Sequence, residues 1–143
     1  MTDVLPKANE SVYAYDLATG RIVFSANSPV QPGIFAAIRA MPGQGAIVGE
    51  TTDISRIYVK NGKVKTRPEM TVAWKNGIDT VAADGTSFIT LTGLPADTDV
   101  YVDQMHAGLY GPTFEVTAEH PGSYSVYLEN FPYMEKVITF TAT

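Results

Sequence analysis

The stretch that most constrains the fold is residues 114–128, which reads as two β-strands joined by a tight turn. Apolar residues alternate with polar ones on both sides of the turn. Alternation with a period of two is typical of a strand that buries one face. Pro121 presets its own φ and Gly122 tolerates a positive φ, so this pair predicts a type II turn. Every second residue from Tyr124 onward is then expected to face a core.

The same kind of pattern extends over the C-terminal half of the chain. From Met70 onward, short β-rich runs alternate with turn signals at intervals of roughly 8–12 residues, as in an antiparallel sandwich. A Pro-Gly-x-Tyr corner before an alternating strand is typical of immunoglobulin-like sandwiches, whose corner tyrosine packs on the core and bonds to nearby backbone. Trp74, the only tryptophan, is expected to anchor that core. The full predicted core is Val72, Trp74, Phe88, Ile89, Leu91, Val100, Val102, Phe114, Val116, Tyr124, Val126, Val137 and Phe140.

The N-terminal half predicts β-hairpins with little apolar material for a core of their own. Residues 1–10 are polar and are expected to form a flexible arm. Asp16 and Gly20 stand between two runs of β-forming residues and predict a first hairpin. Asn61-Gly62 predicts a second hairpin with a two-residue type I′ turn. Small β units of this kind usually need a partner surface or neighbouring copies.

One short helix is expected at residues 34–41, whose apolar residues would share a face, although a short strand is a close alternative. Arg67-Pro68 closes the second hairpin, because the residue before proline is held extended and proline cannot donate to a ladder. The chain is therefore predicted to be mainly β. N-terminal β-hairpins at residues 11–68 would form an attachment region, followed by an immunoglobulin-like antiparallel β-sandwich at residues 69–143.

Composition excludes several classes of function. With 45% hydrophobic and 17% charged residues, the 143-residue chain has material for a packed core. The formal net charge of −5 and the scattered Lys and Arg leave no basic stripe for nucleic acid. No apolar run approaches the ~18 residues of a membrane helix, and no signal-peptide core is visible, so we expect folding in the cytoplasm without membrane insertion. The absence of cysteine rules out disulfides and thiolate nucleophiles.

Candidate catalytic or metal-ligating residues are few. Asp97, Asp99 and Asp103 supply carboxylates of the type that bind calcium, but without the EF-hand pattern, and capping of turns is the simpler interpretation. The only histidines, His106 and His120, have no spaced partner and are expected in surface loops. No nucleophile elbow or phosphate loop accompanies them. We therefore expect no catalytic residues, no metal and no cofactor.

Tyrosines and the second hairpin are the best candidates for an interaction role. Tyrosine rings stack on sugars or fill protein interfaces, although most of them suit strands in any case. Lys60, Lys63 and Lys65 on the hairpin either keep its edge from indiscriminate pairing or accompany an edge that adds to a partner's sheet. The candidate interaction residues are Tyr58, Asn61, Gly62, Val64, Tyr110 and Tyr133.

Three segments, in this order along the chain, resemble small tail-associated structural proteins of tailed bacteriophages. They are the Tyr-x-x-Asp-x-x-Thr-Gly hairpin at residues 13–20, the Tyr-Val-x-Asn-Gly…Arg-Pro hairpin at 58–68, and the immunoglobulin-like turns at 83–85, 91–95 and 121–124. The resemblance implies a non-enzymatic virion component of the tail or tail fibre, made in the host cytoplasm. Its partners would be other virion proteins and further copies of itself. The alternative is a carbohydrate-binding sandwich that adheres to a host-surface glycan through Trp74 or the loop tyrosines.

Overall fold

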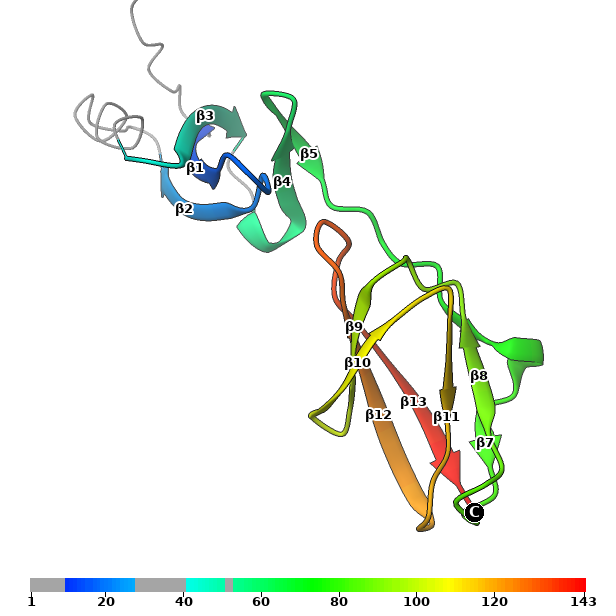
Figure 1. The fold of residues 1–143 in the computed structure, drawn as a ribbon. Coiled ribbons are helices and arrows are strands. Elements are labelled where there is room, and N and C mark those ends of the chain that lie inside the picture. The colour runs from blue at the N-terminus through cyan, green and yellow to red at the C-terminus, as the bar shows by residue number, and fades with distance from the viewer. Residues whose placement is uncertain (1–9, 28–40, 51–52) are drawn as a thin grey trace, which may run out of the picture. The chain divides into compact units, whose positions relative to one another are not determined.

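The computed structural model describes residues 10–27, 41–50 and 53–143, and these are mainly β (Figure 1). The chain divides into two compact units, residues 1–67 and residues 68–143. The expected arm and the expected short helix fall almost entirely outside the described residues. Among the described residues, no helix is long and apolar enough to span a membrane.

The N-terminal unit contains a three-stranded antiparallel sheet in the order β2-β1-β3. Its strands are β1 (Glu10–Asp16), β2 (Ile22–Asn27) and β3 (Gln44–Glu50). The connection from β1 to β2 is fixed by Asp16, whose Oδ1 accepts hydrogen bonds from the backbone of Ala18 at 2.8 Å and of Thr19 at 3.2 Å. Gly20 then adopts a φ of 80°, which permits the tight return into β2.

A hairpin follows the sheet. It consists of β4 (Ile57–Lys60) and β5 (Lys63–Thr66), preceded by the short 3₁₀ helix η1 (Ile54–Arg56). Asn61 and Gly62 have φ values of 53° and 72°, as the predicted type I′ turn requires. The hairpin is held to the first turn, because Val59 N donates to Gly20 O at 2.8 Å.

The N-terminal unit has more of a core than its sequence suggests. Tyr13 is fully buried in a cluster with Ile22, Ile57 and Val59. On the other face of β1, Val12 and Ala14 are buried beside Ala26, Ala46 and Val48. Both faces of the central strand therefore contribute to packing, which the expectation of little core material missed.

The C-terminal unit is an immunoglobulin-like antiparallel β-sandwich of two sheets, β10-β9-β12-β13-β7 and β11-β8-β6 (Figure 1). Its strands are β6 (Ala73–Trp74), β7 (Thr80–Val81), β8 (Ile89–Thr92), β9 (Thr98–Val102), β10 (Met105–Tyr110), β11 (Thr113–Val116), β12 (Gly122–Glu129) and β13 (Lys136–Ala142). The 3₁₀ helix η2 (Lys75–Gly77) follows β6. In immunoglobulin notation the sheets are A′GFCC′ and ABE, and the β13–β7 pair is parallel.

Most of the residues predicted for the sandwich core are buried there, but the prediction is wrong for two of them. Leu91, Val100 and Val126 are fully buried in one cluster with Trp74. Phe88 and Val137, however, are 56% and 61% exposed. Each stands beside an isoleucine that faces the core side instead, so two adjacent apolar residues left the inward face ambiguous in the sequence.

The tyrosine corner is present, although the turn before it differs from the prediction. The Tyr124 hydroxyl donates to His120 O at 2.6 Å, and its ring stacks on Phe140 with centroids 5.1 Å apart. The bend lies at Glu119 and His120, while Gly122 already begins β12 with a φ of 149°. The type II turn expected at Pro121-Gly122 is therefore wrong, because the chain reverses slightly earlier.

Candidate interaction surfaces

The side of the β4–β5 hairpin that faces away from the Tyr13 cluster carries three lysines. Tyr58 pairs with Lys65 and Lys60 pairs with Lys63, and residues opposite one another in an antiparallel ladder project to the same side. These four residues form what we call the lysine face: Tyr58, Lys60, Lys63 and Lys65. The three lysines are exposed, and none of them makes an ion pair with another described residue.

The candidate residue Val64 projects to the other side of this hairpin. Its side chain packs against the Tyr13 cluster, and a Cβ placed on Gly49 would lie 3.3 Å from Val64 Cγ2. Because Val59 N donates to Gly20, the Val59–Val64 pair is not a hydrogen-bonded pair of the hairpin, and the Val64 N–H points away from β4. Any contact that Val64 makes with a partner would therefore use its backbone.

The two candidate tyrosines of the sandwich have separate surroundings. Tyr110 is the last residue of β10, and its ring packs edge-on against that of Phe114 with the ring centroids 4.6 Å apart. Its hydroxyl donates a hydrogen bond to Ala107 O at 3.3 Å. Tyr133 lies between β12 and β13 and packs against the main core cluster. Trp74 is buried and donates Nε1–H to Thr139 O at 3.1 Å, so it offers no exposed ring for a sugar.

An aromatic row drawn from strands β9, β10 and β12 crosses the outer surface of the larger sheet. Tyr101 pairs with Tyr127 on one side and with His106 on the other. Ring centroids lie 5.8 Å apart for the two tyrosines and 4.8 Å apart for Tyr101 and His106. His106 lies in strand β10, so the expectation that it stands in a surface loop is wrong.

Two carboxylates flank this row. Asp99 and Glu129 stand directly opposite each other on β9 and β12. Asp99 Oδ1 lies 2.8 Å from His106 Nε2, and the Tyr127 hydroxyl donates to Glu129 Oε2 at 3.3 Å. Burial raises the pKa of the Tyr127 phenol above its usual range, and the negative charge of Glu129 raises it further. We call Asp99, Tyr101, His106, Tyr127 and Glu129 the tyrosine–carboxylate face.

The alternation of inward and outward residues along β9 and β12 was the sequence signal that could have predicted which residues form this face. Val100 and Leu128 point inward, so their neighbours must point outward. What alternation cannot give is the register between β9 and β12, which are far apart in the chain. That register places Asp99 opposite Glu129 and Tyr101 opposite Tyr127.

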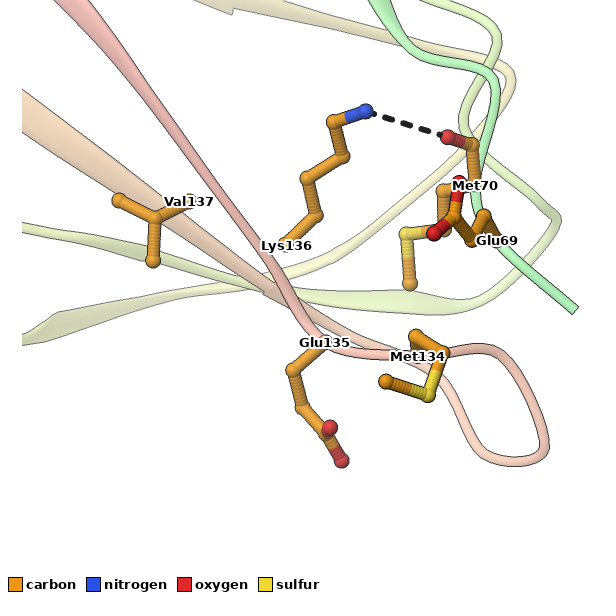
Figure 2. A pocket seen from close by; sticks show the side chains of 6 residues that line it. All are labelled: Glu69, Met70, Met134, Glu135, Lys136 and Val137. Carbon is orange, nitrogen blue, oxygen red and sulfur yellow. Dashed lines mark hydrogen bonds between the residues drawn. The ribbon is translucent and has the colours of Figure 1, made fainter. Parts of the chain in front are cut away.

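A separate open pocket of about 270 Å³ lies beside the start of β13 (Figure 2). It is lined by Glu69, Met70, Met134, Glu135, Lys136 and Val137. Lys136 Nζ donates to the backbone O of Met70 at 3.4 Å, a contact drawn in Figure 2. The pocket lining combines thioethers with two carboxylates and a lysine, and contains no nucleophile paired with a base.

The closely spaced aspartates serve local structure. Asp103 accepts a hydrogen bond from Ser125 N at 2.8 Å, and Asp99 binds His106. Asp97 adopts a φ of 58° in a turn before β9. Within the described parts of the chain, no group of three or more acidic, histidine or cysteine side chains is placed to hold a metal ion.

Comparison with known proteins does not assign the chain to a family. No protein-family model matches the chain, and no curated protein matches it. One similar solved structure is a glycosyl hydrolase family 2 member from Bacteroides cellulosilyticus, at 10% sequence identity and a TM-score of 0.36. The match covers 95% of this chain and 22% of that one. At this TM-score the likeness carries no argument about function.

Proposed function

We propose that this protein is a non-enzymatic structural component of a bacteriophage virion, associated with the tail or tail fibre. The observation that supports the proposal is the division into two compact units, each with apolar clusters of its own. In this arrangement the N-terminal region attaches to another virion protein, and the immunoglobulin-like domain projects. The resemblance of the hairpin and corner motifs to tail-associated proteins gives the proposal its context.

The β4–β5 hairpin is the proposed attachment element. Its tip is set by Asn61 and Gly62, and its outward side is the lysine face. Among the described residues, β5 has no ladder partner other than β4. A backbone edge of this kind is a site at which a partner's strand adds to a sheet.

The proposal as a whole is tested by a mass-spectrometric inventory of purified particles of the phage that encodes the chain. We expect the protein to remain with the particles through a density gradient, in a fixed ratio to the tail proteins. Its presence in the lysate but not in the particles would refute the virion role.

The attachment role is tested by Val64→Pro, with Val64→Thr as the matched control. Proline removes the N–H that points away from β4 and fixes φ, whereas threonine keeps the N–H and nearly the same shape. We expect Val64→Pro to be lost from particles while the fluorescence of Trp74 still reports an intact sandwich. Normal incorporation of Val64→Pro would rule out the backbone edge as the attachment.

A second function, binding of a host-surface glycan, is favoured by one observation. Tyr101 and Tyr127 present partly exposed rings next to carboxylates, and this pairing of stacking surfaces with hydroxyl acceptors suits a sugar. A glycan array read at millimolar sensitivity tests it. Specific binding that Tyr101→Ala or Tyr110→Ala abolishes would support the adhesion role, and an array without signal would remove it.

A further inference from the structure

Formal charge is divided unequally between the two units. Residues 1–67 carry eight of the ten Lys and Arg residues and five acidic residues, a net charge of +3. Residues 68–143 carry two basic and ten acidic residues, a net charge of −8. The total of −5 conceals this difference. Oppositely charged surfaces of two protein molecules attract each other over roughly a Debye length, about 10 Å at 0.1 M salt.

Within each unit, one face places like charges directly opposite each other. Lys60 stands opposite Lys63 on the hairpin, and Asp99 stands opposite Glu129 on the sandwich. Directly opposed like charges destabilise a sheet. Each opposition therefore adds repulsion within its own unit, which the contacts of Asp99 with His106 and of Glu129 with Tyr127 offset only in part, and a group of opposite charge would relieve it.

The aromatic residues of the two faces extend this complementarity. Tyr101 and Tyr127 lie beside the two carboxylates, and a lysine ammonium is attracted both to a carboxylate and to the face of an aromatic ring. Lys60 and Lys63 lie next to the turn of the hairpin, on either side of Asn61-Gly62. The tyrosine–carboxylate face thus has the chemistry that receives the lysine face.

We propose that the lysine face of one copy of this chain docks on the tyrosine–carboxylate face of a second copy. The interface is heterologous, since two different surfaces meet, and a dimer joined in this way leaves one face of each kind free, the tyrosine–carboxylate face on one copy and the lysine face on the other. Such contacts close into rings or continue as filaments. The occupant of the sandwich face is therefore the β4–β5 hairpin of another copy of this chain, and this inference does not depend on the virion role.

The test uses two full-length variants that each lose one face. Lys60→Gln/Lys63→Gln/Lys65→Gln neutralises the hairpin. Asp99→Asn/Glu129→Gln neutralises the sandwich face while it keeps oxygen acceptors for His106 and Tyr127. The matched control, Glu115→Gln/Glu119→Gln, removes the same number of charges in and just after β11 of the other sheet.

Sedimentation velocity over a range of concentrations and salt is the measurement. The wild type and the control are expected to self-associate at low salt and to dissociate as salt rises. Each face variant alone is expected to associate at least about tenfold more weakly, as for the loss of two or three exposed ion pairs. An equimolar mixture of the two variants is expected to form dimers and nothing larger, because one variant can only donate a hairpin and the other can only receive it.

Three results would overturn the proposal. A wild type that remains monomeric at all concentrations at low salt would show that no second copy binds. Equal association of the control and the face variants would show that charge at these positions is not the cause. A mixture of the two variants without dimers would show that the two faces do not meet each other.

Discussion

Replacement of the corner tyrosine, Tyr124→Ala, is expected to destabilise the sandwich by about 3 kcal/mol. The hydroxyl hydrogen bond to His120 O contributes about 1 kcal/mol. The stacked contact with Phe140, nearly parallel at 10°, contributes about 1 kcal/mol. Burial of part of the ring contributes roughly 1 kcal/mol more, since truncation leaves a space that the core fills only incompletely.

Trp74 makes the assay specific for the sandwich. It is the only tryptophan in the chain and is buried in the C-terminal unit, so its fluorescence follows the unfolding of that unit. For a domain of this size, 1 kcal/mol shifts Tm by roughly 4–8 °C. The Tyr124→Ala protein should therefore melt about 12–24 °C below the wild type.

Two companion variants test the reasoning behind that figure. Tyr124→Phe keeps the ring and loses the hydroxyl, so it should cost about 1 kcal/mol. Tyr127→Ala removes a ring from the outer face of the same strand and should cost much less than Tyr124→Ala. Equal melting shifts for Tyr124→Ala and Tyr127→Ala would refute the inward and outward assignment of β12.

Three further predictions concern other parts of the chain. Gly20→Ala should loosen the β4–β5 hairpin, because Gly20 has a φ of 80° and an added Cβ would overlap Val59 O. Hydrogen exchange at the Val59 amide should then become faster, while the unfolding followed by Trp74 fluorescence should not change. Hydrogen bonds from Ser87 and Thr86 hold the pKa of Asp84 well below its usual range, so its stabilisation is present above about pH 4 and is lost as pH falls further. The Tm difference between wild type and Asp84→Asn should therefore shrink in acid, and a difference that grows there would contradict this. Limited proteolysis should leave residues 69–143 as the resistant fragment, because the larger cluster lies there, whereas survival of the N-terminal half alone would contradict the prediction.

Local chemistry explains why parts of the fold were predictable from sequence. The turn at Asn61-Gly62 needs two residues with positive φ, and few residue pairs other than Asn-Gly provide them readily. The corner at Tyr124 and the burial of Val126 follow from strict alternation over one strand. Each of these features is decided by neighbours within a few positions.

Features that depend on pairing between distant segments were not predictable. At Phe88-Ile89 and Val137-Ile138, two apolar residues stand side by side, and only the packing of the sheets decides which one faces inward. The tyrosine–carboxylate face likewise depends on the register of β9 against β12. The charge difference between the units is visible in the sequence, but the opposed like charges become evident only from the ladders.

Those opposed charges lead to a last prediction, which separates a binding role from a structural one. If Asp99 and Glu129 face each other to receive a partner, they cost stability in the isolated sandwich. Asp99→Asn/Glu129→Gln should then leave the free energy of unfolding unchanged or raise it by about 0.5 kcal/mol, read from Trp74 fluorescence in dilute protein. The same variant should lose self-association. A loss of more than about 1 kcal/mol would instead mean that the carboxylates hold the sandwich together, chiefly through Asp99 and His106, and that their opposition serves the fold.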